Sequence, residues 1–398
     1  MAGAKKFQKF DQYSLRGKLR QEGFERWRYT FCASNKISGE ERNFFIEMYL
    51  VNPVISPKVV VIAQKSRLAL NENEIQYALA GTDSAIKGDT EIVVRPSYVV
   101  IKAGIYGMPA KQLNKFIPSS ELFFSKNECS FKVGECTFAP NALFGAISVS
   151  AQELRVKPEI ASDAGIMDWD LKFERQISCG MIHSGKDHSF VPYGIKTAFS
   201  GTVHFDGEEY IVTPRTSFGY SDKSWGQSLL KNYYHLSASK MTSIISGKSM
   251  VNSCFVIEGE YDGALKAFVN IDGHSFKIEK KSFFNRFTEI HDVNQMPANE
   301  DGDKIHWSMS IHKGKFVIDL DIMCRADEML VRDYEIPQGK RTLLRVLGGG
   351  TGKGEIRIFK KNGKNLELLE HANIFDAMCE YGHFEEIGNT AISSDFEE

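Results

Sequence analysis

Two short segments of the sequence place an acid, a base and a tryptophan close to glycine. Residues 219–226 read Gly-Tyr-Ser-Asp-Lys-Ser-Trp-Gly, and residues 23–27 read Gly-Phe-Glu-Arg-Trp. A carboxyl group that lines an apolar cavity is hard to ionise and can act as a general acid. Asp222 and Glu25 are therefore the candidate catalytic acids, with Glu258 and Glu260 next in order.

The same residues also suit a structural role. A tryptophan near the first strand of a small barrel commonly closes one end, with an Arg or Lys stacked across its face by cation–π attraction. Arg26, Arg28 and Lys223 would then be packing partners. Because successive side chains of a strand point to opposite faces, Asp222 and Lys223 can diverge. The spacing alone favours this structural interpretation over catalysis.

A glycine-rich stretch at 348–354 has the composition of a phosphate-binding loop but not its spacing. The pattern requires glycine at Leu347 and Ser or Thr after Lys353, and it should open a helix, whereas residues 355–359 look like a strand. We predict a flexible loop between strands. Serine hydrolase chemistry has no support either, because no Gly-x-Ser-x-Gly motif is present.

The cysteines and histidines do not form a recognised metal motif. Cys129 and Cys136, with His183 and His188, lack zinc spacing and are interpreted as small hydrophobic residues and surface histidines. The seven cysteines are scattered without a Cys-x-x-Cys pair, which favours reduced thiols and no structural disulfide. We expect no metal and no other cofactor.

The elements that must position these residues are mostly strands. Residues 305–323 alternate apolar and polar side chains around a Lys-Gly turn, which predicts an antiparallel hairpin. Asp-Gly or Asn-Gly turns begin at positions 206, 262, 272, 301 and 362. Further strands are expected at 44–51, 59–63, 92–101, 169–177, 251–258, 264–271 and 274–280. Short helices are predicted only at 109–116 and 373–381.

Length and composition set the organisation. At 398 residues the chain exceeds what one core usually organises. We predict an all-β fold of two consecutive antiparallel barrels, over 1–200 and 201–398. A net charge of -2 gives no reason to expect nucleic acid as a partner. No apolar run is long enough to span a bilayer, and no secretory signal is recognised, so we expect a cytoplasmic protein. A transient contact with a membrane surface would be consistent with this expectation.

Aromatic residues are the candidate ligand contacts. The chain has 28 Phe, 14 Tyr and 4 Trp, and an eight-stranded barrel holds either one apolar ligand or the side chains that fill it. Aromatic walls suit an isoprenoid or polyketide, so we expect a small apolar ligand as the partner and leave the oligomeric state open. The candidate ligand-binding residues are Trp27, Tyr29, Tyr220, Trp225, Tyr233, Tyr234 and Trp307.

These motifs resemble the tocopherol cyclase-like family. The likeness rests on residues 23–27 with Tyr29, on 201–210 leading into 219–226, and on Ile-Pro-Gln-Gly at 336–339. It implies two lipocalin-like domains, as in the related carotenoid hydratases, and an acid-catalysed, cofactor-independent ring closure on a prenyl chain.

The chain also departs from the family's pattern. Arg26 and Arg28 stand where the family usually has glycine and tyrosine, and residues 229–234 lack its Pro and further tryptophans. These differences weaken the substrate inference more than the fold inference. An intramolecular cyclase is the main hypothesis, and the alternatives are a carotenoid hydratase-like enzyme and a non-catalytic lipid or isoprenoid carrier.

Overall fold

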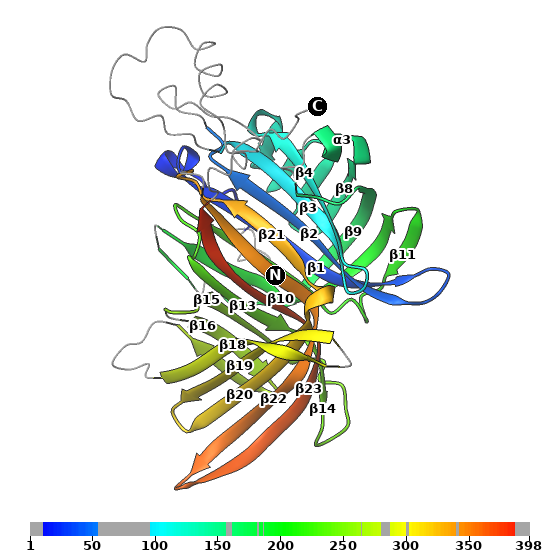
Figure 1. Ribbon diagram of the computed structural model, residues 1–398. Helices are drawn as coiled ribbons and strands as arrows, with labels where there is room; N and C mark the ends of the chain where they lie inside the picture. The colour runs from blue at the N-terminus through cyan, green and yellow to red at the C-terminus, as the bar shows by residue number, and fades with distance from the viewer. Residues whose placement is uncertain are drawn as a thin grey trace, which may run out of the picture.

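The computed structural model describes residues 11–54, 96–156, 161–180, 183–185, 187–263, 265–279, 287–299, 302–339 and 342–386. Almost all of them form strands (Figure 1), which confirms the predicted all-β fold. The helical elements described are short: α3 (Ala151–Val156) and the 3-10 turns η1 (Gly17–Arg20), η2 (Ser119–Glu121) and η4 (Ala326–Glu328). No described helix is long and apolar enough to cross a membrane.

The first sheet, called here the first barrel, has 12 strands in the order β4-β3-β2-β1-β11-β10-β9-β8-β7-β6-β5, with β12 pairing with β1 and β10. It curls until β4 meets the segment before β9, where the Asp163 amide donates to the Gln112 carbonyl at 2.8 Å. Its strands are β1 (Phe24–Asn35), β2 (Glu41–Val51), β3 (Tyr98–Tyr106), β4 (Lys111–Pro118), β5 (Leu122–Ser125), β6 (Ser130–Val133), β7 (Cys136–Ala139), β8 (Ala142–Val149), β9 (Gly165–Ile177), β10 (Ser189–Phe205), β11 (Glu208–Val212) and β12 (Gly219–Gly226).

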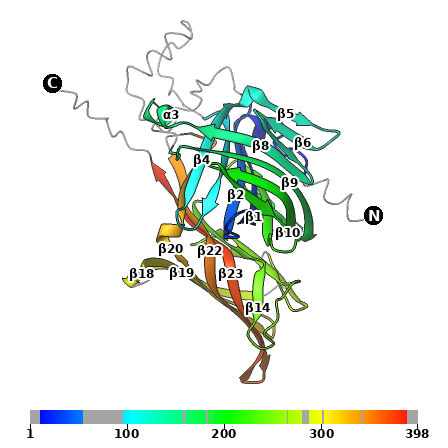
Figure 2. The same cartoon turned by 90° about the vertical axis from the view of Figure 1, so that its right-hand side faces the viewer.

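The second sheet, called here the second barrel, has 11 strands in the order β17-β16-β15-β13-β23-β22-β20-β19-β18, with β14 on β23 and β21 on β22. It is a half barrel that wraps around its own core (Figure 2). Its strands are β13 (Asn232–Ala238), β14 (Lys240–Ser243), β15 (Cys254–Glu260), β16 (Leu265–Ile271), β17 (His274–Ile278), β18 (Phe287–Asn299), β19 (Gly302–Lys313), β20 (Phe316–Arg325), β21 (Leu330–Glu335), β22 (Thr342–Asn362) and β23 (Asn365–Glu386).

Alternating side chains explain why these segments are strands. In β9, Trp169, Leu171 and Phe173 are buried, whereas Asp170 and Lys172 between them face solvent. A period of two with one buried face is the pattern of a half-buried strand. The predicted hairpin at 305–323 is confirmed as β19 and β20, which pair through the turn with Lys313 opposite Phe316.

The two sheets pack against each other through their outer faces. Two apolar clusters at this interface combine residues from both sheets, such as Phe24 and Tyr49 with Tyr334, and Phe190 with Val256. Strand β1 is therefore buried on both faces over most of its length. This double burial explains why its sequence carries little simple alternation.

The sheet change falls later in the chain than the predicted domain boundary. Strands β11 and β12 pair within the first sheet, and the chain enters the second sheet only at Asn232. Sheet membership therefore favours a division between 226 and 232, rather than at residue 200, for the two domains that the sequence predicts.

Both predicted helices are wrong. Residues 111–118 form β4, in which Leu113 faces the barrel core and Phe116 packs on the opposite side against an apolar cluster between the sheets. Residues 373–381 lie within β23, where Ile374 and Met378 also belong to different buried clusters. Burial on both faces gave each strand an apolar spacing that looks helical.

The glycine-rich stretch 348–354 is part of β22, with irregular pairing at its glycines, and is not a loop. A Cβ atom at Gly350 would overlap the ring of Tyr106 from β3. Glycine there lets the first barrel approach the second sheet. The predicted strand at 59–63 and the start of the one at 92–101 lie outside the described residues.

Candidate functional site

The acid and the base of the 219–226 motif point to opposite faces of β12. Strand β12 pairs with β1 so that Asp222 lies opposite Arg28 and Lys223 opposite Trp27. The Lys223 Nζ lies 2.8 Å from the Glu25 Oε1, on the face that looks into the first barrel. Asp222 instead accepts a hydrogen bond from the Arg28 Nε at 3.0 Å, between the two sheets. The motif therefore contributes to two separate sites.

The barrel-side site joins Glu25 to the segment that closes one end of the first barrel. One Glu25 oxygen accepts hydrogen bonds from the backbone amides of Ser14, at 2.9 Å, and Leu15, at 3.2 Å. The other accepts from the Trp27 Nε1 at 3.0 Å. Lys223 lies 4.3 Å from the centre of the Trp27 ring, as a cation–π partner. Burial lowers the pKa of Lys223, and the neighbouring Glu25 opposes that shift.

The second site is a buried set of charged residues between the sheets, called here the inter-sheet cluster. Each of its members is at most 2% exposed. The first barrel contributes Arg26, Arg28, Glu47, Lys102 and Asp222, and the second contributes His235, Glu258, Arg332 and Glu380. Arg28 binds Asp222 and Glu380 together, and Arg332 binds Glu380 from the other side.

Tyrosine and histidine side chains complete the inter-sheet cluster. The Tyr233 hydroxyl accepts from Arg26 and lies 3.2 Å from carboxylate oxygens of both Glu258 and Glu380. Glu258 is also 3.2 Å from the His235 Nδ1 and 3.4 Å from the His188 Nε2. Its carboxylate therefore has polar partners on both oxygens, as a buried charge requires.

The charges of the inter-sheet cluster balance. Its four cationic residues, Arg26, Arg28, Lys102 and Arg332, face four carboxylates, Glu47, Asp222, Glu258 and Glu380. Burial alone would raise the pKa of Glu258, but hydrogen bonds from His188 and His235 hold it far below its usual range. Burial alone would also raise the pKa of Glu380, but Arg28 and Arg332 hold it below its usual range. Burial and the Arg28 charge lower the pKa of His235, which favours the neutral imidazole.

Asp222, His235 and Glu258 bring ligand atoms within 4.8 Å of one another, as a metal site would. The Arg28 guanidinium already fills this position. Its Nη2 binds Asp222 and lies 3.4 and 3.5 Å from the two nitrogens of His235. A metal cation there would face an adjacent guanidinium, so these residues do not fit a metal ion.

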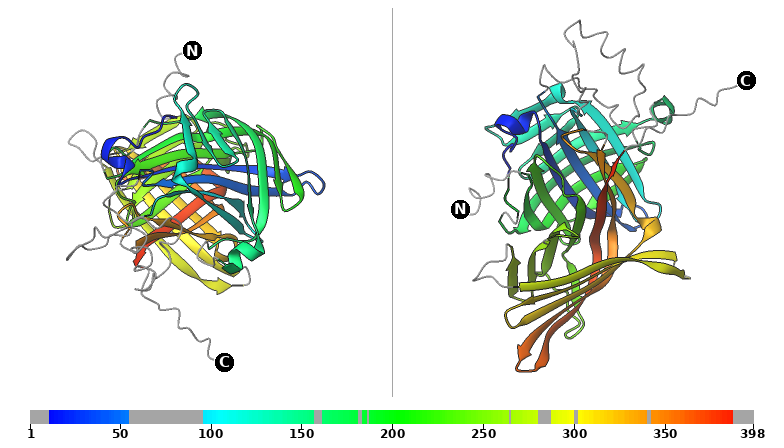
Figure 3. Two further views of the ribbon diagram at one scale, coloured as in Figure 1. Left: turned by 90° about the horizontal axis from the view of Figure 1, so that it is seen from above. Right: turned by 60° about the vertical axis from the view of Figure 1, so that its left-hand side comes forward.

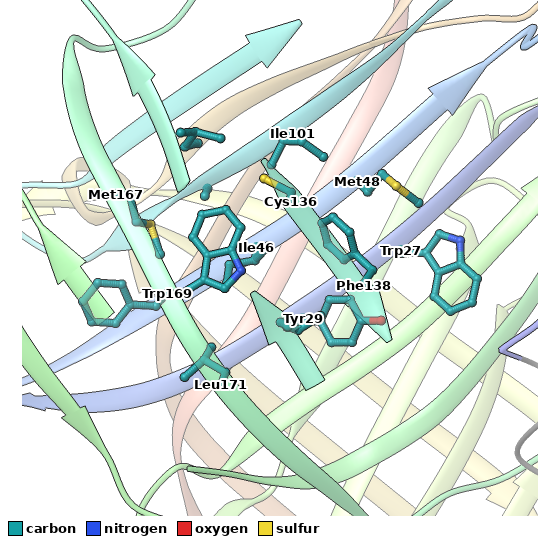
Figure 4. Packing of buried hydrophobic residues seen from close by; sticks show 14 of the residues in the cluster. Trp27, Tyr29, Ile46, Met48, Ile101, Cys136, Phe138, Met167, Trp169 and Leu171 are labelled. Carbon is teal, nitrogen blue, oxygen red and sulfur yellow. The ribbon is translucent and has the colours of Figure 1, made fainter. Parts of the chain in front are cut away.

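The predicted ligand-binding aromatics fall into three separate places. Trp27 and Tyr29 lie inside the first barrel, where they pack with other rings and apolar side chains (Figure 4), and Trp225 is half-buried against the same core. Tyr220 and Tyr233 lie between the sheets, the first in an apolar cluster there and the second beside Glu258. Tyr234 and Trp307 belong to the core of the second barrel. The structure does not gather them into one pocket.

The sequence predicts His183 and His188 as surface residues. The structure instead places both beside Glu258, where they are half-buried. The His183 Nε2 lies 3.2 Å from the Glu258 carbonyl oxygen, and burial lowers the pKa of His183 to about 4. The His188 side chain is 9% exposed, and it contacts the Glu258 carboxylate.

A sequence signal for several members of the inter-sheet cluster does exist. Single charges interrupt apolar runs at Glu47 within 44–50, Lys102 within 99–103 and Glu258 within 254–259. A lone charge in such a run must be buried with a partner.

A cavity of about 680 Å³, called here the mouth cavity, lies between the 11–20 segment and β5. The 11–20 segment contains η1, seen in dark blue at the upper end of the first barrel (Figure 3, right). Its lining includes Tyr13, Leu15, Arg16, Arg20, Phe124 and Lys126. A second cavity, of about 570 Å³, is lined on the second sheet by charges of both signs, among them Lys304, Arg325, Lys353, Glu328 and Glu355.

The fold and these sites define an all-β protein of two consecutive antiparallel barrels with a charged interface. No model of a protein family matches the chain, and no curated protein matches its sequence. Two solved structures are similar over most of the chain. A protein of Nitrosomonas europaea assigned as an AttH has 10% identity and a TM-score of 0.42, covering 93% of this chain and 95% of its own. Kievitone hydratase from Nectria haematococca has 10% identity and a TM-score of 0.39, covering 93% of each chain. Neither likeness assigns a function to this chain.

Proposed function

We propose that this protein is a carrier for a small apolar or amphipathic molecule, such as an isoprenoid or another lipid, and that it binds this ligand in the mouth cavity. The observation that carries the proposal is the cavity itself. Its volume of about 680 Å³ is in the range of small-molecule sites, and Tyr13, Leu15 and Phe124 give it an apolar floor. The interior of the first barrel is a less suitable site, because side chains fill it.

The ion pairs favour a carrier over an acid-catalysed cyclase. Protonation of an alkene requires a carboxyl group that reaches the bound substrate. Glu25 is paired with Lys223 and Asp222 with Arg28. Neither residue lines the mouth cavity, so both candidate acids are better suited to holding the fold together than to donating a proton to a ligand there.

A hydratase-like enzyme is the second candidate, and His235 is the observation in its favour. A neutral imidazole that is hydrogen-bonded to a carboxylate, as His235 is to Glu258, can act as a general base toward water. Both side chains are fully buried, so a substrate could reach them only if the sheets separated. Loss of alkene hydration in a His235→Gln variant that still binds ligand would support this candidate over a carrier.

The carrier proposal can be tested by titrating the full chain with prenylated quinols, isoprenoid alcohols and fatty acids. A chain of ring contacts links the mouth cavity to Trp27: Tyr13 and Phe124 contact Phe131, which lies 5.2 Å from the indole. Binding should therefore cause a saturable change in tryptophan fluorescence at micromolar ligand concentrations. Such an affinity corresponds to a binding free energy of about -8 kcal/mol.

A matched pair of variants locates the site. Phe124 lines the mouth cavity, whereas the neighbouring Phe123 points away and is 65% exposed. Phe124→Ala should weaken binding at least tenfold, and Phe123→Ala should leave it unchanged. If no ligand class gives a saturable signal, the carrier proposal is wrong.

A further inference from the structure

The charged side chains around the mouth cavity are all cationic. Of the residues that line it, Arg16, Arg20 and Lys126 carry charge, and none is acidic. The whole chain has a net charge of -2, so this concentration of positive charge is local. Among the described residues, none of the three cations forms an ion pair, and Arg16 has only a long hydrogen bond, of 3.4 Å, to Gln12.

The apolar part of the cavity lies below these cations. Leu15 is 1% exposed and belongs to the barrel core. The ring centres of Tyr13 and Phe124 are 5.8 Å apart, and both rings contact Phe131 deeper in the barrel. The cavity therefore has an aromatic floor and a cationic rim.

We propose that the ligand is a single-chain amphiphile with an anionic head, either a carboxylate or a phosphate monoester. This inference rests on the proposed function, because it names the ligand class of the same cavity. The head would lie between Arg16, Arg20 and Lys126, because guanidinium groups bind both kinds of anion through paired hydrogen bonds. The tail would contact Tyr13, Leu15 and Phe124. A neutral alcohol would leave the three cations without a counter-charge.

The Glu25–Lys223 pair explains why the anion would stay at the rim. Glu25 lies beneath the 11–20 segment, and its carboxylate already accepts the amides of Ser14 and Leu15. Lys223, the cation deeper in the barrel, is already neutralised by Glu25, whereas the charged residues of the rim are all cations. The charge pattern therefore orients the ligand with its head outward.

The test uses ligands that share one alkyl chain and differ only in the head: a fatty acid, an alkyl phosphate, a primary alcohol and a primary amine. Affinities would be measured on the full chain by tryptophan fluorescence and by calorimetry. We expect the acid and the phosphate to bind at least tenfold more tightly than the alcohol, and the amine to bind weakest. The preference should shrink as salt is raised, because the rim is exposed.

A variant with Arg16→Gln, Arg20→Gln and Lys126→Gln should lose the preference for the acid while its affinity for the alcohol stays within about twofold. All three side chains are exposed, so the variant should fold, which its melting temperature would verify. Lys18→Gln is the matched control, because Lys18 is exposed in the same η1 turn but does not line the cavity. It should leave the preference unchanged.

The outcomes separate this inference from the proposed function. Equal binding of the acid and the alcohol would overturn the anionic head and leave the carrier proposal intact. Failure of the whole series to bind would overturn both. If inorganic phosphate bound as tightly as the alkyl phosphate, the cavity would be a site for the free anion, and the proposal of an amphiphilic ligand would be wrong. Binding to vesicles of anionic phospholipid, without binding of any monomeric ligand, would indicate a membrane-contact surface and would also overturn the inference.

Discussion

Asp222 and Lys223 are adjacent in the sequence, yet their ionic partners lie on opposite sides of one strand. Lys223 pairs with Glu25 inside the first barrel, and Asp222 pairs with Arg28 between the sheets. Strand β12 thus joins two charged sites that share no side chain. A change on one face can be compared directly with a change on the other, and the first two predictions below use this separation.

Asp222→Asn should destabilise the protein without affecting ligand binding in the mouth cavity. The substitution leaves Arg28 buried with a single carboxylate partner, Glu380. Breaking one side of a buried ion pair costs about 3–5 kcal/mol. Urea unfolding measures the loss, and Asp168→Asn is the control, because its exposed pair with His204 should contribute under about 1 kcal/mol. Unchanged stability combined with lost turnover would instead make Asp222 a catalytic residue.

Glu25→Gln should loosen the 11–20 segment as well as lower stability. It removes the counter-charge of Lys223 and weakens the acceptor for the Ser14 and Leu15 amides. Hydrogen exchange at these two amides should become at least tenfold faster, and affinity for the ligand should fall. A Glu25→Gln/Lys223→Met double variant should recover part of the stability, since no buried charge is then left unpaired. Unchanged exchange at Ser14 and Leu15 would show that Glu25 does not hold the segment.

Stability should fall as the pH drops from about 6.5 toward 4, because the pKa values of the buried His183 and His235 are both lowered in the folded protein. Burial gives His183 a folded-state pKa of about 4, below the ordinary value of 6.5. Between these values the unfolded chain binds a proton that the folded protein does not, so acidification favours unfolding. Full protonation of the unfolded state would remove up to about 3 kcal/mol. Urea midpoints at pH 7.5, 6, 5 and 4.5 measure this slope, and His183→Gln should reduce it, leaving the contribution of His235. An identical slope in the variant would assign the effect to other groups.

Gly350→Val should weaken the packing of the two sheets. A Cβ atom at this position would overlap the ring of Tyr106 across the interface. Overpacking of this kind typically costs about 1–3 kcal/mol. Thermal unfolding of Gly350→Val, compared with Gly350→Val/Tyr106→Leu, measures the effect, because the smaller side chain makes room for the new one. Equal melting temperatures for Gly350→Val and the parent protein would contradict the close approach.

Much of the fold could be predicted from local patterns. Strand β9 and the hairpin of β19 and β20 have one buried face, so their sequences alternate as expected. The sequence predicts a helix in place of β4 because Leu113 and the half-buried Phe116 pack on opposite sides, against two different clusters. A period of two disappears when both faces of a strand are covered.

The candidate site was harder to predict because its contacts join distant parts of the chain. Arg28 and Glu380 are 352 residues apart, and Arg26 and Tyr233 are 207 apart. The motif drew attention to Asp222 and Glu25, which are both buried in the structure, but their partners could not be inferred from one sequence. The mouth cavity depends on the approach of the 11–20 segment to β5, which no local pattern indicates.

The ion pair between Arg28 of β1 and Glu380 of β23 bears on the order in which a newly made chain can fold. Strand β1 is synthesised before β23, the last strand described, and β23 carries Glu380, which binds both Arg28 and Arg332. Figure 2 shows this long strand reaching from the second barrel up beside the first. Until it emerges, the first barrel must keep its outer arginines hydrated. The two halves therefore cannot close until β23 has been synthesised, and before that the contact surface of the first barrel is open to other chains.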